Sequence, residues 1–188
     1  MKQIIRSLIA LAVFTILLGF GYTLAVTGIA GLAWPDQARG SPVMRAGETV
    51  GSKLLAQPFS ADGNFWPRPS NSGYNADPGL DPTTRALSYP SNLGPLNPDL
   101  EMAIAERVAI HGEGVPVDLV TGSGSSLDPH ISVAGARWQV ARVAASRSIA
   151  EADLHALIDA HTESWLGRRY VNVLLLNLAL DEMTGTQQ

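Results

Sequence analysis

The segment SLIALAVFTILLGFGYTLAVTGIAGLA, residues 7–33, decides the architecture of this 188-residue chain. It contains no charged residue. As an α-helix it would extend roughly 40 Å at about 1.5 Å per residue, enough to cross a bilayer with length left for tilt. Trp34-Pro35 follows, where the indole suits the headgroup region and proline cannot continue the helical hydrogen bonds. Residues 1–35 are therefore predicted to be a cytoplasmic N-terminus and a single transmembrane anchor helix.

A cleaved signal peptide is the alternative reading of this N-terminus. Lys2 and Arg6 precede the apolar run, and Gly31-Leu32-Ala33 offers small residues at its end. The apolar part of a signal peptide is usually about 7–15 residues long, and this run is longer. Length therefore favours the anchor.

Charge is distributed unevenly about the apolar run. All 17 acidic residues lie beyond it, against 11 of the 13 Lys and Arg, so the rest of the chain carries a net charge of −6. This balance argues against a nucleic-acid partner, which needs a basic surface. The basic residues before the run slightly favour a cytoplasmic N-terminus, and a long domain can be translocated whatever its own charge. We therefore expect the domain on the outer face of the membrane.

The chain has no cysteine, which excludes disulfides, thiolate metal ligands and cysteine nucleophiles. Residues 36–188 predict one small mixed α/β domain behind the anchor, so the expected fold class is α/β with a single N-terminal transmembrane helix. The first part of this domain, residues 36–98, is rich in Pro, Gly, Ser and Asn. It also carries aromatic residues that favour packing over disorder, namely Phe59, Phe65, Trp66, Tyr74 and Tyr89.

Local signals predict the elements that follow. Asn97-Pro98 supplies an N-cap and a proline at the first helical position, and the helix should end at Gly112. Residues 115–121 are apolar and β-branched and predict a strand. Residues 171–176 predict a buried strand followed by a short C-terminal turn.

Two further helices are expected between these strands. Ser132 should cap a helix that runs through Ala145. Ser148 and Glu151 should form a capping box for the next helix. That helix presents apolar residues at helical spacing, namely Leu154, Leu157 and Ile158.

The run VDLVTGSGSSLDPHIS, residues 117–132, resembles the signature of the C-subunit family of the Kdp potassium-transporting ATPase. Other segments resemble family segments in the same order: residues 26–30 (VTGIA), 65–70 (FWPRPS), 73–76 (GYNA), 91–98 (SNLGPLNP) and 171–181 (VNVLLLNLALD). The chain departs from the family pattern at single positions, Pro42, Pro67 and Leu175. The resemblance thus covers essentially the whole chain.

The resemblance implies a non-catalytic accessory subunit in the inner membrane of a bacterium. In that family a channel-like subunit selects K⁺, a P-type ATPase subunit hydrolyses ATP, and a small single-span subunit completes the complex. The C subunit is described as an assembly factor and as a catalytic chaperone that raises the pump's affinity for ATP. On this reading the chain binds no cofactor firmly, and ATP acts through the pump subunit.

Nucleotide contact has two candidate sites. The Gly122–Ser126 loop would let backbone N–H groups approach a phosphate, but a plain turn explains it as well, and the Walker A pattern fails because no Lys follows. The resemblance links a glutamine after the signature to ATP, and the matching residue here is Gln139. A solvent-facing helical glutamine is the alternative for that position.

Hydrolase chemistry with Ser125 as nucleophile and His130 as base is the competing function, with Asp128 as the orienting acid. Their sequence spacing is not diagnostic of a triad, and the nucleophile-elbow pattern is absent. We instead expect Ser123, Gly124, Ser125, Asp128 and His130 to shape a partner interface. In that reading Gly124 permits a backbone conformation closed to other residues, and Asp128 fixes a turn.

Gly21, Gly28 and Gly31 lie roughly on one face of the anchor and are expected to form a close-packing seam against a partner helix. An ordinary lipid-facing span is the alternative, because glycine is common in membrane helices. The histidines lack the spacing of a metal site, so none is expected.

Overall fold

The computed structural model describes residues 1–70 and 88–185 and shows two compact units, Met1–Pro42 and Val43–Gln188. The 73–76 segment, with Tyr74, lies outside the described residues.

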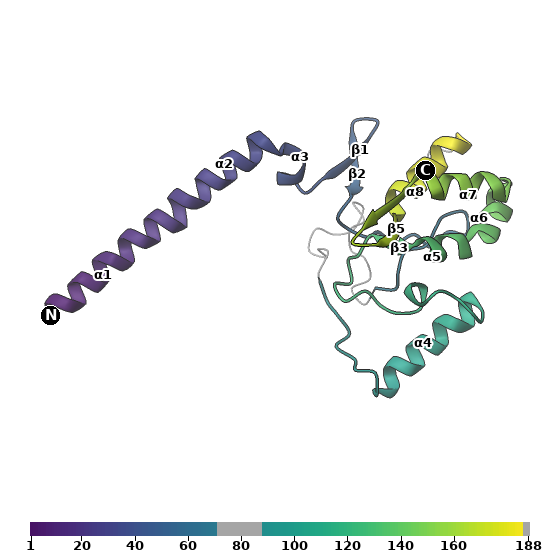
Figure 1. Ribbon diagram of the computed structural model, residues 1–188, viewed down its shortest axis with the longest axis horizontal. Helices are drawn as coiled ribbons and strands as arrows, with labels where there is room; N and C mark the ends of the chain where they lie inside the picture. Colours follow the sequence, from purple (N-terminus) through teal and green to yellow (C-terminus); the bar gives the residue numbers. More distant parts are fainter. Residues whose placement is uncertain (71–87, 186–188) are drawn as a thin grey trace. The chain divides into compact units, whose positions relative to one another are not determined.

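The first unit is one long apolar helix, as predicted (Figure 1). It consists of α1 (Lys2–Phe14), a π-helical stretch η1 (Thr15–Tyr22) and α2 (Thr23–Ala33). The run Lys2–Ala33 contains an 18-residue window with a mean hydropathy of 2.2, and the run is long enough to cross a membrane. Trp34 leaves the helical conformation at φ −139°, and Pro35 begins the short helix α3 (Pro35–Ala38), so the helix ends where the sequence predicted.

Two small antiparallel sheets form the β part of the second unit. The first pairs β1 (Pro42–Arg45) with β2 (Glu48–Ser52). The second has the order β3-β5-β4, with β3 at His130–Ser132, β4 at Thr162–Trp165 and β5 at Arg168–Asn172. Ile131 of β3 lies opposite Val171 of β5, and both are buried, so this pair faces the core.

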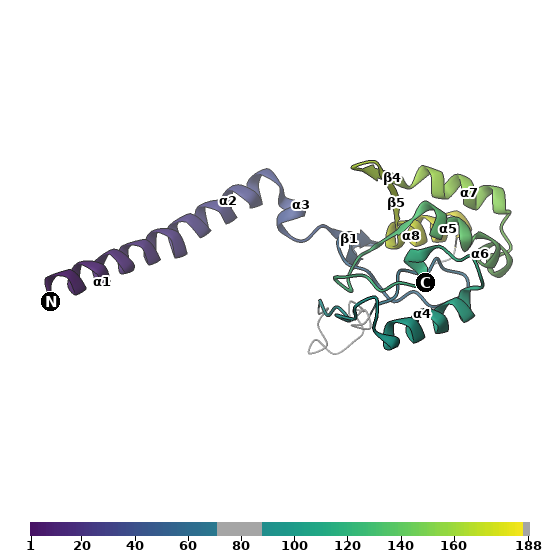
Figure 2. The same ribbon diagram turned by 60° about the horizontal axis from the view of Figure 1, so that its bottom comes forward.

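Helices make up the rest of the unit (Figures 1 and 2): α4 (Pro98–His111), the 3₁₀ turn η2 (Val117–Leu119), α5 (Val133–Trp138), α6 (Val140–Arg147), α7 (Glu151–Ala160) and α8 (Val173–Thr184). The core lies among α5–α8 and the three-stranded sheet. Its fully buried members include Phe65, Leu119, Ile131, Val143, Leu154, Ile158, Val171, Leu176 and Leu180. None of the 14 residues of α4 is buried.

The helix starts were predicted with mixed success. Asn97 caps α4 by accepting from Asp99 N, and α4 ends before Gly112, as expected. Ser132 caps α5, but the helix breaks at Gln139 and α6 runs on to Arg147. The capping box was wrong: Ser148 has φ +55° and terminates α6, while the N-cap residue of α7 is Ala150, which has no side-chain cap.

Of the two predicted strands, the first was wrong and the second was right only for residues 171 and 172. Residues 117–119 form a 3₁₀ turn, because Val117 O accepts from Val120 N and Thr121 N. In the C-terminal run the strand stops at Asn172, whose side chain accepts from Leu175 N and starts helix α8. Residues 173–181, which were expected to be strand and turn, are therefore helical.

Candidate functional site

The Asp118 carboxylate, just before the signature loop (residues 121–132), binds the last residue of the loop, Ser132. Asp118 accepts from Ser132 N at 2.6 Å and from Ser132 Oγ at 3.0 Å. Ser132 Oγ in turn accepts from Gly135 N at 2.9 Å, which caps α5. A Cβ at Gly135 would lie 2.9 Å from Asp118 Oδ2, so a side chain at this position would have to displace the Asp118 carboxylate. The start of the loop is thereby fixed to the helix that follows it.

Asp128 organises the middle of the loop. Its Oδ2 pairs with Arg68 at 3.0 Å, and its Oδ1 accepts from His130 N at 3.0 Å and lies 3.3 Å from His130 Nδ1. Burial raises the pKa of Asp128, but the hydrogen bonds from His130 and Arg68 and the Arg68 charge outweigh it, so the pKa lies below its usual value. The His130 ring packs edge-on against Tyr170, with centroids 4.7 Å apart. The predicted hydrogen bond from the Asp128 carboxylate to the following backbone is confirmed at His130 N, and the same carboxylate also forms an ion pair with Arg68.

Ser123 and Ser125 form hydrogen bonds within the loop. Ser125 Oγ lies 3.1 Å from Ser123 Oγ and accepts from Leu127 N at 3.1 Å. Among the described residues, no hydrogen bond joins Ser125 to His130. The structure therefore brings Asp128 and His130 together but does not add Ser125 as a nucleophile.

Residues 65–70 dock against this loop, although more than 50 positions separate the two segments. Ser70 Oγ donates to Ser126 O at 2.7 Å, and Ser123 N donates to Pro69 O at 3.1 Å. Ser126 is fully buried at φ +59°, and its Oγ donates to Tyr89 O at 2.6 Å. The loop thus has a fixed shape set by contacts from distant parts of the chain.

Gln139, the residue linked to nucleotide by resemblance, is buried, so the alternative of a solvent-facing side chain is wrong. Its Oε1 accepts from Trp66 N at 2.7 Å and from Arg142 at 2.6 Å. Its Nε2 donates to Trp66 O at 3.1 Å and to Gly135 O at 3.3 Å. In this structure the carboxamide holds the backbone of Trp66, and its nucleotide role stays a prediction.

Asn177 of α8 holds the backbone of Phe65, the residue before Trp66, in the same way. Its Oδ1 accepts from Phe65 N at 2.8 Å, and its Nδ2 donates to Phe65 O at 2.9 Å. Two buried carboxamides therefore grip consecutive residues of the segment that supports the signature loop.

Trp66 is also held through its ring. The Arg142 guanidinium lies 3.8 Å from the ring centroid, and His111 meets the ring edge-on at 5.7 Å. Burial and the nearby Arg142 charge lower the pKa of His111, so the neutral imidazole is favoured there. Trp66 Nε1 donates to Ala61 O, which ties the ring to the preceding loop.

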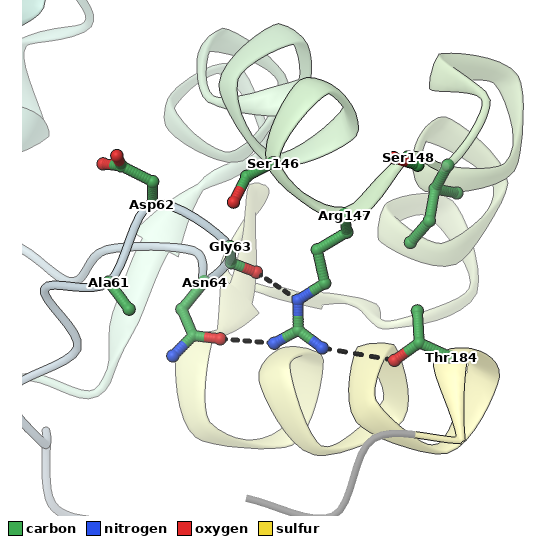
Figure 3. A pocket seen from close by; sticks show the side chains of 9 residues that line it. Ala61, Asp62, Gly63, Asn64, Ser146, Arg147, Ser148 and Thr184 are labelled. Atoms are coloured by element: carbon green, nitrogen blue, oxygen red, sulfur yellow. Dashed lines mark hydrogen bonds between the residues drawn. The ribbon is translucent and has the colours of Figure 1, made fainter.

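A shallow hollow of about 640 Å³ lies between the 61–64 loop, the end of α6 and the end of α8. Figure 3 shows Arg147 crossing this space, with hydrogen bonds to Gly63 O, Asn64 Oδ1 and Thr184 Oγ1. Arg147 also pairs with Asp181 at 2.8 Å. Because the guanidinium donates to protein groups on all sides, the hollow is a structural junction and offers no free cation for an anionic ligand.

Comparison with known proteins identifies the chain. Residues 4–182 match the family model described as KdpC, the K⁺-transporting ATPase c chain. This chain belongs to the KdpC family. A KdpC subunit of Sorangium cellulosum is 50% identical over 93% of this chain and 95% of its own length. KdpC subunits of Mycobacterium tuberculosis, 44% identical over 97% and 99%, and Variovorax paradoxus, 44% identical over 96% and 97%, are similar in extent.

Three of the segments that resembled KdpC meet in space. Residues 65–70 bond to the signature loop, and residues 171–181 join both: Asn177 grips Phe65, and Val173 N donates to Pro129 O at 2.9 Å. The KdpC signature is therefore one packed unit built from distant segments of the chain.

Sequence reasoning missed several residues that build this unit. Arg68, Asp118 and Gly135 carry no local signal, because their partners lie 60, 14 and 17 positions away in sequence. Asn177 had a signal, as a single amide within an apolar run. The expected special backbone at Gly124 was wrong: its φ is not positive, and a Cβ there meets nothing within 4 Å.

The structure neither supports nor excludes a packing role for the anchor glycines. A Cβ at Gly28 or Gly31 would meet nothing within 4 Å in the isolated chain, and Gly21 has only Ile16 O nearby, at 3.9 Å. Their role as a seam stays a prediction. No cluster of His, Asp and Glu suited to a metal ion occurs in residues 1–70 and 88–185.

Proposed function

We propose that this chain is the non-catalytic accessory subunit of a high-affinity, ATP-driven K⁺ uptake complex in a bacterial inner membrane. Its partners are a channel-like K⁺-selecting subunit, a P-type ATPase subunit and a small single-span subunit. It supports assembly of the complex and raises the ATP affinity of the pump subunit. The family match over residues 4–182 supports membership of such a complex.

The single structural observation behind the non-catalytic role is the bonding of the signature loop. Asp128 pairs with Arg68, Ser125 bonds to Ser123 and Leu127, and Gln139 grips Trp66. A catalytic loop needs a nucleophile aligned with a base, whereas these groups stabilise the loop itself. The loop is therefore proposed to present a fixed surface to a partner subunit through Ser123, Gly124, Ser125, Asp128 and His130.

An effect on ATP affinity does not need a nucleotide site in this domain. With the domain on the outer face, cytoplasmic ATP is out of reach. Binding of the subunit to one conformation of the pump changes ATP affinity by linkage between separate sites. In this account ATP is bound by the pump subunit, and Gln139 acts through the shape of the loop.

The proposal is tested with Ser125→Ala and His130→Ala in the complete complex. Both should leave K⁺-stimulated ATPase activity largely intact, because each removes a side chain and keeps the turn. Asp128→Ala should lower the yield of assembled complex, since it breaks the Arg68 pair and the turn. Loss of turnover in a fully assembled Ser125→Ala complex would favour an anchored hydrolase that uses Ser125 and His130.

Orientation is tested separately, and the absence of cysteine makes this simple. A single Glu106→Cys on the exposed face of α4 should react with a membrane-impermeant maleimide in intact spheroplasts. Labelling that requires lysis would place the domain in the cytoplasm and would make direct nucleotide contact the better explanation.

A further inference from the structure

The closed end of the β4–β5 hairpin exposes two large apolar side chains. Trp165 is 68% exposed and Leu166 is 80% exposed. Trp165 lies opposite Arg168, so only Leu166 and Gly167 form the turn. In Figure 2 this end of the hairpin stands clear of α5, α7 and α8.

The turn carries an unfavourable residue at its tip. Leu166 has φ +47° and Gly167 has φ +77°, the left-handed pair of a type I′ turn. Asn-Gly suits such a turn, whereas a bulky residue at positive φ is strained. An exposed leucine at a strained position has no role in packing within the described residues. Strain of this kind is typical of sites that contact something else.

The charge next to this tip is basic, although the domain as a whole carries −6. Arg168 and Arg169 follow the turn directly and are both exposed. Glu163, two residues before Trp165, is the nearest acidic residue along the hairpin. Tryptophan, leucine and arginine together suit the interface of a lipid bilayer, where apolar side chains enter the acyl boundary and arginines meet anionic headgroups.

We propose that Trp165 and Leu166 insert into the headgroup region of the bilayer in which the chain is anchored, with Arg168 and Arg169 bound to anionic lipid. The covalent link to the helix Lys2–Ala33 keeps the domain close to a lipid surface, so a small contact is sufficient for docking. This inference rests on the helix crossing a bilayer and not on the accessory role, so either can fail alone.

The test uses the full chain in lipid nanodiscs with one introduced cysteine. Ser164→Cys places an environment-sensitive fluorophore beside the intact tip, and Ala109→Cys on the exposed face of α4 is the matched control. With phosphatidylglycerol present, the label at 164 should be quenched by spin-labelled lipid and protected from aqueous iodide, whereas the label at 109 should not. Arg168→Gln and Arg169→Gln should each weaken docking about fivefold, and high salt should act in the same direction.

Leu166→Asn separates docking from folding. It should reduce protection of the label while leaving the thermal midpoint unchanged or higher, because Asn-Gly relieves the strained turn. Equal exposure of the two labels to iodide in every lipid mixture would overturn the proposal. Protection of position 164 that appears only when the pump subunits are present would also overturn it, and would assign the tip to a protein interface.

Discussion

Asn177 and Gln139 show how single buried side chains position the signature loop from a distance. Each makes paired hydrogen bonds to the backbone of one residue, Phe65 or Trp66. A carboxamide is the side chain that donates and accepts side by side, which a peptide unit requires. Their hydrogen bonds go to Phe65, Trp66, Gly135 and Arg142, so both residues act on the loop through the 65–70 segment.

Asn177→Leu should lower the free energy of unfolding by about 2–4 kcal/mol, because Phe65 N–H and C=O lose their partners in the core. Urea denaturation of the full chain in detergent measures this. Gln37→Leu, at an exposed carboxamide, is the control and should have little effect. A loss below about 0.5 kcal/mol for Asn177→Leu would show that water replaces the two hydrogen bonds from Asn177 to Phe65.

Two glycines of this region make a matched pair. Gly135→Ala should cost about 1–3 kcal/mol, because its Cβ would lie 2.9 Å from the Asp118 carboxylate that holds Ser132. Gly124→Ala should change stability by less than about 0.5 kcal/mol, because that position is open. Thermal unfolding of both variants measures these changes in stability. Similar losses of stability for the two variants would mean that the Asp118 side chain shifts to make room for the new Cβ at position 135.

Asp128 should make stability depend on acid pH. Because its pKa is lowered in the folded state, the unfolded chain takes up the proton first as pH falls. The contribution of Asp128 is complete above the unfolded carboxyl pKa of about 4 and is lost as pH falls through the lower folded value. The difference in urea midpoint between the wild type and Asp128→Asn should therefore be largest near neutral pH and shrink below about pH 4. A difference that does not change with pH would contradict the Arg68 and His130 pairing.

At the scale of elements, the sequence predicted correctly those features that depend on hydrogen bonds between residues close together in the chain. Asn97 and Ser132 were read as caps, and both cap helices. It failed where tertiary contacts decide. In residues 173–181 most buried positions recur at helical spacing, but the other leucines hide the pattern; the buried positions are Val173, Leu174, Leu176, Asn177, Leu180 and Asp181.

The other misassigned elements have different causes. Val117 to Thr121 is rich in β-branched residues, but its turn directs the Asp118 carboxylate at Ser132, 14 positions away. Ser148 looks like a cap, but it ends the preceding helix in a left-handed conformation. The membrane helix needed no tertiary information, because its length and composition suffice.

Helix α4 should be the least stable helix of the domain. It has no buried residue, and the hydrogen bonds that hold it run from Arg107 to Val120 O and from Trp138 to His111 O. Hydrogen exchange should therefore be faster across residues 98–111 than across α8, and Arg107→Gln should increase the difference. Equal protection of the two helices would mean that α4 opens only with the whole domain.

At the scale of the whole molecule, the anchor and the domain have separate tasks. The helix Lys2–Ala33 is long and apolar enough to cross a membrane, while the domain contains a loop whose shape is set by residues 65–70 and 171–181. In the proposed function, the subunit contributes binding energy to one state of its partner and performs no chemistry itself. That proposed role is visible only in the complex.

Co-purification tests this account most directly. The tagged chain, extracted in mild detergent from cells that produce all subunits, should elute with the channel-like subunit, the P-type ATPase subunit and the small single-span subunit. The eluted material should show K⁺-stimulated ATPase activity, and Ser125→Ala should elute with the same partners and comparable activity. A chain that elutes alone from such cells, or that hydrolyses a substrate without partners and loses this activity on Ser125→Ala, would contradict the accessory-subunit account.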